Sequence, residues 1–347
     1  MKTDHYLSAL RRAGATAEGA DPVPLCLLAP LSGVTDLHMR RIARRCGADA
    51  VVSEMVAARE LTRGSGEATL RAEGSGVDLH VVQLAGCEAG PMAEAARLAE
   101  AGGADVIDVN MGCPAKIVTG IASGSALMRD LDHAVSLIEA TIAAVKVPVT
   151  LKMRLGWDDR SLNSPELARR AEASGVQMIT VHGRTRCQFY KGEANWNAVR
   201  AVKDAVSVPV VVNGDITSFH KAVGALQMSG ADAVMIGRGA QGQPWLPGQI
   251  GRRLETGVAE TAPSLAEQLK HVRALYDEIC SHYGLRIGLK HARKHLGWAL
   301  ETAAAYSCAP TATLKAWRQA ILTAEQPSSV HRSLEDAYDD FAWSAAA

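Results

Sequence analysis

The sequence of 347 residues predicts an α/β chain: a (β/α)8 TIM barrel followed by a C-terminal all-helical bundle. Between residues 23 and 254, eight short apolar runs alternate with Ala-rich, charge-bearing stretches of helical pattern. After residue 254 no strand-like run occurs, and only helical patterns follow. A doubly wound parallel sheet is the alternative for the first part. The barrel is favoured because the repeat reaches eight units and then stops.

The apolar runs fall into two alternating classes. In one class a glycine that ends a helical stretch precedes the run, as at Gly47, Gly103, Gly175 and Gly230, where it is expected to cap the helix. Runs of the other class often begin with Val-Pro. All are apolar enough to be buried on both faces, which is typical of parallel strands inside a barrel. The predicted strands are 25–30, 49–53, 79–84, 104–109, 148–153, 177–181, 208–212 and 232–236.

Three segments are therefore expected along the chain. Residues 1–22 are predicted to be a mobile N-terminal segment, 23–254 the barrel and 255–347 a helical domain. Within the barrel, the Gly-, Ser- and Glu-rich piece 62–76 is predicted to be a loop. The helices predicted in the last domain are 264–283, 286–302, 310–323 and 330–343.

Composition limits the classes of function and site. The 37 basic and 37 acidic residues cancel, so a nucleic-acid contact would require a local basic patch. The seven cysteines show no CxxC spacing, which argues against a zinc site or disulfide framework and for a reducing cytoplasm. The start of the sequence lacks the apolar core of a secretory signal, and no apolar run is long enough to span a membrane. A cytoplasmic protein without metal or membrane association is expected.

Every predicted strand ends in polar residues or glycine. The catalytic residues of such barrels lie at the carboxyl ends of the strands, and a purely structural barrel would not need Lys, Gln, His, Asn and Arg to converge there. The strand ends are Pro30–Gly33, Ser53–Met55, Gln83–Gly86, Asn110–Cys113, Lys152–Arg154, His182–Arg184, Asn213–Asp215 and Gly237–Gly239.

The last two strand ends predict a phosphate site. Gly237 to Gly242 match GxGxxG after a strand, but no further strand follows, so the dinucleotide-binding fold does not apply. Backbone N–H groups after the seventh and eighth strands, with the Arg238 side chain, are typical of phosphate binding in barrels. Asn213–Asp215 would form the other side of this site.

Lys152, at the end of a buried strand, has three interpretations. It could form a Schiff base, pair with Glu54, or face the electron-rich side of a bound ring. The amide of Gln83 and the thiol of Cys113 favour the third, because amides read the pyrimidine edge of a flavin and a cation stabilises its reduced anion. His182 beside Lys152 and Arg184 supports the same site. Cys113 taken alone could equally be a small apolar residue in a turn.

One predicted helix of the last domain is rich in basic residues. Arg286, Lys290, Arg293 and Lys294 fall largely on one face at helical spacing. A solvated charged face is the simpler interpretation. A phosphate-binding patch is the alternative, and it is supported by the scarcity of acidic residues among these bases.

Taken together, several strand-end motifs resemble those of the tRNA-dihydrouridine synthases. The bacterial B class is most similar, through Cys113–Lys116 and Gly124–Leu127. Two departures are visible: Leu31-Ser32 replaces the commoner Met-Ala, and Ile117 stands where the B class usually has a second lysine. The motifs that carry the resemblance are Ala29–Asp36, Asn110–Pro114, His182–Thr185, Asn213–Ile216 and Gly237–Gly239.

This resemblance implies FMN in the barrel and a helical domain that grips tRNA. Cys113 would be the proton donor. The residues implied to hold FMN are Pro30, Leu31, Ser32, Gln83, Lys152, His182, Asn213, Gly214, Asp215, Gly237 and Arg238. Those implied or predicted to contact RNA are Asn110, Arg154 and Arg184 in the barrel and Arg286, Lys290, Arg293 and Lys294 in the helical domain.

The expected reaction reduces the C5=C6 bond of tRNA uridines with FMN and NADPH (or NADH). Reduced flavin would deliver a hydride to C6, and Cys113 would protonate C5, since a thiol of ordinary pKa, about 8.5, is mostly protonated at neutral pH. A monomer is expected. One alternative is a small-molecule FMN oxidoreductase of the dihydroorotate dehydrogenase type, which leaves the basic helix without a role. The other is a non-catalytic RNA-binding protein, which leaves the polar strand ends unexplained.

Overall fold

The computed structural model describes residues 23–114 and 123–346. The segment 1–22, predicted to be mobile, and the positions Lys116 and Ile117 lie outside the described residues. The chain divides into two compact units, Met1–Gly239 with Leu246–Val258, and Ala240–Trp245 with Ala259–Ala347. The sequence boundary at 254 differs from this division because helix α10 (Leu246–Thr256) runs past it.

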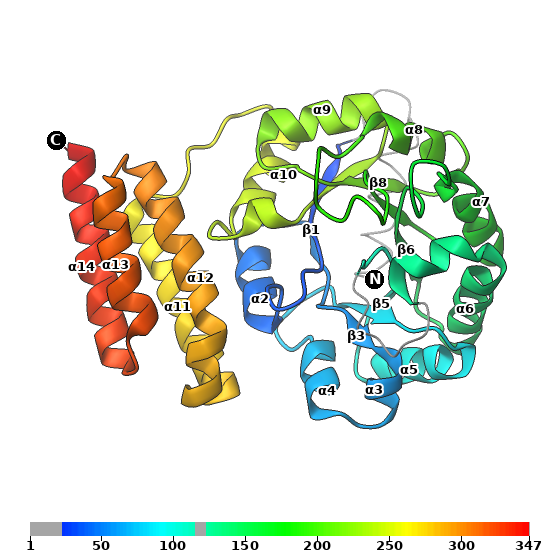
Figure 1. Cartoon of the computed structure of the whole chain (residues 1–347), viewed down its shortest axis with the longest axis horizontal. Coiled ribbons are helices and arrows are strands. Elements are labelled where there is room, and N and C mark those ends of the chain that lie inside the picture. The colour runs from blue at the N-terminus through cyan, green and yellow to red at the C-terminus, as the bar shows by residue number, and fades with distance from the viewer. Residues whose placement is uncertain (1–22, 115–122, 347) are drawn as a thin grey trace. The chain divides into compact units, whose positions relative to one another are not determined.

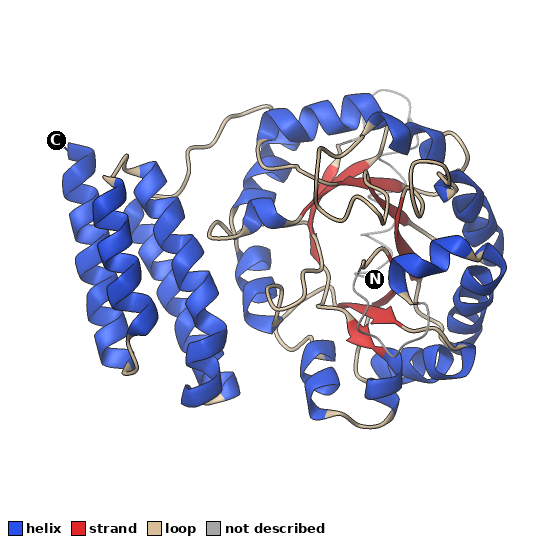
Figure 2. Cartoon of the chain, viewed as in Figure 1, coloured by secondary structure: helices blue, strands red, loops and turns tan. Residues whose placement is uncertain are grey.

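The first unit is a closed barrel of parallel strands, surrounded by helices (Figure 1; strands in red in Figure 2). Neighbours follow the order β2-β1-β9-β8-β7-β6-β5-β4-β3, and a parallel bridge from Val52 to Val81 closes the ring. This closure confirms the barrel over the doubly wound sheet. The strands among the described residues are β1 (Leu25–Leu28), β2 (Ala50–Val51), β3 (Val56–Ala57), β4 (Val81–Ala85), β5 (Val106–Met111), β6 (Val149–Arg154), β7 (Ile179–His182), β8 (Val210–Asn213) and β9 (Ala233–Ile236).

Nine labelled strands build a barrel of eight because its second strand is interrupted. β2 pairs with β1, whereas the short β3 pairs with β4 farther toward the carboxyl end. The segment between them contains Ser53 and Glu54 and leaves the regular ladder. Each predicted strand is present with shifts of a few residues at its ends.

Helices cover the outside of this barrel (Figure 1). They are α2 (Leu37–Arg45), α3 (Ala58–Thr62), α4 (Gly66–Ala72), α5 (Ala89–Ala101), α6 (Leu131–Ala144), α7 (Ser164–Ser174), α8 (Asn197–Lys203), α9 (Phe219–Ser229) and α10, with the 3-10 turns η1 (Gly124–Arg129) and η2 (Arg238–Ala240). The prediction of a loop over 62–76 is wrong, because α4 lies within it. Good helix formers and a salt bridge from Arg71 to Glu67 stabilise this helix despite the flanking glycines.

The glycines predicted to end helices do so. Gly175 and Gly230 are the C-caps of α7 and α9, with φ of 108° and 66°. Gly47 and Gly103 follow the C-caps of α2 and α5 by one residue and also have positive φ. Only glycine adopts this left-handed conformation without a steric penalty, so each helix stops where the next strand must begin.

Side chains inside the barrel form an apolar layer and a polar layer. The apolar layer includes Leu27, Val81, Val106, Val211 and Met235, all fully or nearly fully buried. Two residues farther along the strands, the inward side chains become polar, as at Gln83 after Val81 and Asp108 after Val106. The period of two residues along a strand sends both sets to the same side, and the polar set lies nearer the carboxyl ends.

The second unit contains four helices: α11 (Leu265–Tyr283), α12 (Leu285–Tyr306), α13 (Thr311–Thr323) and α14 (Pro327–Ala346). A capping box between Ser264 and Glu267 starts α11. α11 packs on α12, where a Cβ at Gly288 would lie 2.7 Å from Cα of Cys280, so the close approach requires glycine. The four predicted helices are confirmed. Within the described ranges, none is long and apolar enough to cross a membrane.

Candidate functional site at the barrel mouth

Strand register brings the predicted polar residues together at the carboxyl end of the barrel. Gln83 on β4 pairs with Asp108 on β5, and Asn110 on β5 pairs with Lys152 on β6. One step farther around the barrel, His182 on β7 pairs with Arg154 and with Asn213 on β8. These residues are spread over four helical crossovers in the sequence. The parallel ladder alone makes them neighbours.

A chain of hydrogen bonds joins Gln83, Asp108, Thr150 and Asn110. Asp108 accepts from Nε2 of Gln83 at 2.7 Å and from Oγ1 of Thr150 at 2.6 Å. Nδ2 of Asn110 donates to Oε1 of Gln83 at 2.7 Å. All four side chains are buried. Burial raises the pKa of Asp108, while the bonds from Thr150 and Gln83 and the charge of Lys152 oppose the rise.

The loop that carries Cys113 is held in place on both sides. Oδ1 of Asn110 accepts from the backbone N–H groups of Gly112 and Cys113, at 3.1 and 3.0 Å. The carbonyl of Cys113 accepts from the N–H and the hydroxyl of Ser125, at 3.0 and 2.9 Å. The thiol is a free, half-buried group at the barrel mouth. Asn110, predicted to contact RNA, therefore shapes the loop of the predicted proton donor.

Lys152 is a buried cation. Its Nζ donates to Oδ1 of Asn213 at 3.2 Å, and Nδ2 of Asn213 donates to the carbonyl of Met235 at 2.8 Å. Burial lowers the pKa of Lys152 to about 8, against the attraction of Asp108. Among the described residues, Asn213 is its one hydrogen-bond acceptor, although an ammonium can donate three bonds. Glu54 instead accepts from the N–H of Gly33, which leaves the interpretation of an ion pair with Lys152 without support.

His182 is neutral at neutral pH. Burial lowers its pKa well below the ordinary range, and the nearby charges of Lys152, Arg154, Arg184 and Arg238 lower it further. Nη1 of Arg184 lies 3.3 Å from Nε2 of His182. A guanidinium can only donate, so Nε2 accepts and the ring proton is on Nδ1.

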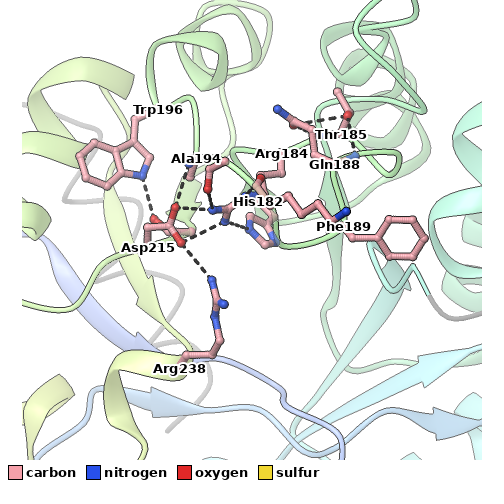
Figure 3. A network of polar contacts seen from close by, with 12 residues as sticks. His182, Arg184, Thr185, Gln188, Phe189, Ala194, Trp196, Asp215 and Arg238 are labelled. Atoms are coloured by element: carbon pink, nitrogen blue, oxygen red, sulfur yellow. Dashed lines mark hydrogen bonds and ion pairs between the residues drawn. The ribbon is translucent and has the colours of Figure 1, made fainter.

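Asp215 connects two arginines at the mouth (Figure 3). It accepts from Arg184 at 2.5 and 3.0 Å, from Arg238 at 3.1 Å and from the N–H of Ala194 at 2.9 Å. Partial burial favours a higher pKa, but the bonds from Arg184 and Ala194 outweigh it and lower the pKa of Asp215. The carboxylate is thus engaged by the protein. The predicted contact of Asp215 with FMN stays a prediction.

Backbone shape distinguishes the two glycine-containing strand ends. Gly214 has a φ of 120°, and a Cβ there would lie 2.7 Å from Cβ of Ala194 and 2.9 Å from the ring of His182. At Gly239 a Cβ would lie 2.7 Å from the carbonyl oxygen of Ile216. Gly237 is half-buried, and the nearest atom to a Cβ there is 3.6 Å away. Two of these glycines are required by close packing of the loops after β8 and β9, whereas a Cβ at Gly237 would make only ordinary contacts.

The first strand end forms a compact turn. The N–H of Leu31 donates to Oγ1 of Thr35 at 2.8 Å, and the N–H groups of Val34 and Thr35 donate to the carbonyl of Leu31. Pro30 and Leu31 are half-buried and Ser32 is exposed. The turn is shaped by Thr35 and the backbone. Its predicted contact with FMN through backbone groups stays a prediction.

Arg154 and Arg184 are both 1% exposed, and both donate to backbone carbonyls of the loops at the mouth. Arg154 donates to the carbonyls of Gly112, Thr185 and Phe189, each within 2.8 Å. Arg184 donates to those of Lys191 and Gly192 as well as to Asp215. Both guanidinium groups hold the loop 183–195 against the mouth. A direct contact of either with a uracil stays a prediction.

Aromatic residues of this mouth were missed from the sequence. Tyr190, 53% exposed, has the guanidinium carbons of Arg154 and Arg238 within 5.5 and 5.3 Å of its ring centre. Trp157 lies between Arg129 and Arg186, each 4.9 Å from its ring. The available signal was an adjacent Phe-Tyr pair after the strand end of His182, in a chain with only 4% aromatic residues.

In the second unit, α12 presents the predicted basic residues. Arg286 and Lys290 are exposed, and Arg293 and Lys294 are half-buried. Within the part of the chain that the structure describes, none of the four forms an ion pair. Their charges are therefore available to an external anion. Over the same residues, no cluster of three His, Cys, Asp or Glu side chains has the arrangement of a metal site.

Comparison with known proteins assigns a family. The family model described as dihydrouridine synthase (Dus) matches residues 27–342. A protein of Rhizobium leguminosarum bv. phaseoli named probable tRNA-dihydrouridine synthase is 53% identical over 90% of this chain and 95% of its own length. A protein of the same name from Rickettsia conorii is 55% identical, over 78% of this chain and 83% of its own length. The tRNA-dihydrouridine synthase B of Pseudomonas putida is 45% identical, over 80% and 82%.

A solved structure resembles the fold. That of 6-hydroxypseudooxynicotine amine oxidase from Pseudomonas geniculata N1 superposes with a TM-score of 0.52 at 15% identity. The match covers 78% of this chain and 53% of that one. A similarity at this level of identity concerns the fold alone.

Proposed function

The chain belongs to the dihydrouridine synthase family, and we propose that it reduces uridines of tRNA to 5,6-dihydrouridine with FMN and NADPH (or NADH). The observation that carries the proposal is the convergence of Cys113, Lys152 and neutral His182 at one barrel mouth. A small-molecule oxidoreductase of the dihydroorotate dehydrogenase type is not favoured by the family or by the basic face of α12. A non-catalytic RNA-binding protein would not need the buried polar layer.

The residues at the mouth fit a flavin. The Nζ of Lys152 has bonding capacity left in a buried setting, which suits the electron-rich N1/O2 edge of the ring. Gln83 keeps one N–H and one lone pair beyond its bonds to Asp108 and Asn110, so it can also pair with a pyrimidine edge. His182 has its proton on Nδ1 and can donate. The exposed guanidinium of Arg238 suits the ribityl phosphate.

Bound and reduced, FMN would supply the hydride that adds to C6 of the uracil. The protein's own residues do the rest. Hydride addition places negative charge on C5 and the C4 carbonyl, and the thiol of Cys113 donates the proton that C5 requires. Asn110 holds the loop so that the thiol stays at the mouth. No second nucleotide-binding fold is present among the described residues, so the nicotinamide donor would use the same mouth in turn.

The substrate base must leave its stack to reach this site. RNA presents such bases in loops, where an unstacked base can lie against an aromatic ring or a guanidinium plane. Tyr190, exposed beside Arg154 and Arg238, offers such a surface. The four bases of α12 would bind the tRNA backbone. In this proposal the protein works as a cytoplasmic monomer.

The direct test is chemical. Purified protein is incubated with FMN, NADPH and tRNA from a strain that lacks the enzyme, and the nucleosides are analysed by mass spectrometry. A gain of two mass units in specific uridines, dependent on FMN, is expected. Unchanged tRNA together with a colourless protein that cannot be loaded with FMN would contradict the proposal.

The basic face of α12 predicts how tRNA binding responds to charge removal. Lys290→Ala with Arg293→Ala should weaken tRNA binding and reduce the slope of log K against log salt by about 2, because each phosphate contact contributes about 0.9. Flavin content should not change. The matched control is Lys315→Ala with Arg332→Ala, which removes two exposed charges from α13 and α14. If both pairs weaken binding equally, the effect belongs to total charge and not to α12.

The lowered pKa of Lys152 predicts how FMN binding depends on pH. The free protein loses the Lys152 proton as pH rises through about 8. An electron-rich ligand prefers the charged form, so FMN affinity should fall about tenfold between pH 7 and pH 9. Fluorescence titration of the flavin-free protein measures this. Lys152→Met should bind FMN more weakly with no such dependence, and an equal pH dependence in that variant would refute the assignment to Lys152.

A further inference from the structure

Asp108 lies one hydrogen bond behind the flavin-facing residues and has no role so far. It is on β5, 4% exposed, between Gln83 on β4 and Thr150 on β6. A buried carboxylate in a barrel is costly, and among the described residues this one makes its hydrogen bonds to Gln83 and Thr150. Its two hydrogen-bond partners are both side chains, and one of them leads to Cys113.

At the loop of Cys113, one end of the chain of hydrogen bonds, it is fixed which group donates and which accepts. The backbone N–H groups of Gly112 and Cys113 can only donate, so the Asn110 side chain must present Oδ1 to them. Its Nδ2 then faces Gln83, which must present Oε1. The backbone N–H groups of the loop thus set the orientation of the Asn110 amide, and Asn110 sets that of the Gln83 amide.

At Asp108, the other end of the chain of hydrogen bonds, donors and acceptors are arranged in the same direction. Once Oε1 of Gln83 faces Asn110, its Nε2 faces position 108 and needs an acceptor. An ionised carboxylate only accepts, and its second oxygen takes the hydroxyl proton of Thr150. The distances of 2.6 and 2.7 Å are in the range of charge-assisted bonds. Between two fixed ends, each amide has one orientation that satisfies every bond.

We propose that Asp108 is a positioning residue, which fixes the amide of Gln83 and, through Asn110, the loop that presents Cys113. The inference rests on the proposed function for the role of Cys113. A neutral amide at 108 could accept or donate, so Gln83 could reverse. Asn110 would then have to turn its Nδ2 toward the N–H groups of Gly112 and Cys113, and both loop bonds would be lost.

The first variant is Asp108→Asn. It keeps the size of the side chain but replaces a group that only accepts hydrogen bonds by one that can also donate. Its single-turnover rate of dihydrouridine formation should fall about tenfold or more, because small misplacements of a reacting group have such effects. The affinity for tRNA should not change. The matched control is Asp105→Asn, which lies immediately before β5, where among the described residues the carboxylate accepts from the N–H of His80. That variant should react at the wild-type rate.

A charge exchange separates positioning from general damage. In Gln83→Glu with Asp108→Asn, the amide at 108 donates to the carboxylate at 83, which also accepts from Asn110. The direction of the Asn110 amide and the total charge are both restored. Gln83→Glu alone places two carboxylates side by side. Because Gln83→Glu also removes an N–H assigned to the flavin, recovery is measured on Cys113 in the flavin-free protein. The thiol should be alkylated more slowly in the double variant than in either single variant, a non-additive result that independent effects cannot produce.

A second measurement does not depend on uridine reduction. Alkylation of Cys113 by iodoacetamide in the free protein, followed by peptide mass spectrometry, reports how accessible the thiol is. The rate should rise several-fold in Asp108→Asn and return toward wild type in the double variant. The proposal would be overturned if the effects of the two substitutions on the alkylation rate added up in the double variant. It would also be overturned if Asp108→Asn showed the wild-type rates of both dihydrouridine formation and alkylation. If the proposed function fails, the wild-type protein forms no dihydrouridine. The alkylation rates of Cys113 in the variants would still test the role of Asp108 in that case.

Discussion

Cys113→Ala is expected to abolish nearly all uridine reduction while FMN stays bound. Removal of a positioned proton donor typically lowers a rate by about 10² to 10⁴-fold. The contacts assigned to FMN come from Gln83, Lys152, His182 and the loops after β8 and β9, and none requires the thiol. Single-turnover formation of dihydrouridine gives the rate, and the visible absorbance of the purified variant gives the flavin content.

Two further variants sharpen this result. Cys113→Ser retains a hydroxyl of much higher pKa, so it should remain strongly impaired, because a weaker acid donates a proton more slowly. Cys187→Ala changes an exposed thiol and serves as the matched control, with an unchanged rate. Full activity in Cys113→Ala would remove the thiol from the mechanism and leave water as the source of the C5 proton.

Asp215→Asn is expected to destabilise the barrel by about 3 kcal/mol, since it leaves a buried guanidinium without its counter-charge. Arg184 is 1% exposed and Asp215 23%, so solvent screens the pair little. Asparagine tolerates the positive φ of 54° at this position, so the variant tests the charge and not the backbone. Urea denaturation measures the loss. Glu94→Gln, which breaks the exposed pair with Arg97, should show no measurable change.

The same variant should change the response to acid. The pKa of Asp215 is lowered from 3.8 in the folded protein, so its contribution to stability is complete above that value. It is lost as pH falls through the lower folded pKa. Wild type should therefore lose this increment of stability in acid, whereas Asp215→Asn lacks it at every pH. If the difference between the two proteins does not shrink on acidification, the ion pair is not the source of the stability.

The sequence predicted the barrel because its evidence is local and repeated. Buried parallel strands read as apolar runs, and glycines such as Gly175 and Gly230 end helices by a conformation that other residues rarely adopt. The exception was 62–76, where glycines around α4 suggested a loop. A short helix is stabilised by packing, here through the buried Ala68, and a single-sequence pattern does not reveal that packing.

The residues of the site were also visible in the sequence, since each strand ended in an unusual polar residue. Their roles depend on neighbours. Arg154 and Arg184 were predicted to contact the substrate, yet Arg154 donates to carbonyl groups of the loops at the mouth and Arg184 to such carbonyls and to Asp215. Asp108 had no predicted role, and its partners lie on β4 and β6.

By itself, the sequence determined the elements, the order of the polar strand ends, Cys113 and the basic face of α12, because these depend on residue type and on spacing along the chain. Only the tertiary structure decided which strand ends touch, which groups are buried and which hydrogen bonds they make. Those properties arise from the register of β4 through β9. Register sets the burial that lowers the pKa values of Lys152 and His182, and the direction of the bonds from Asp108 to the loop of Cys113.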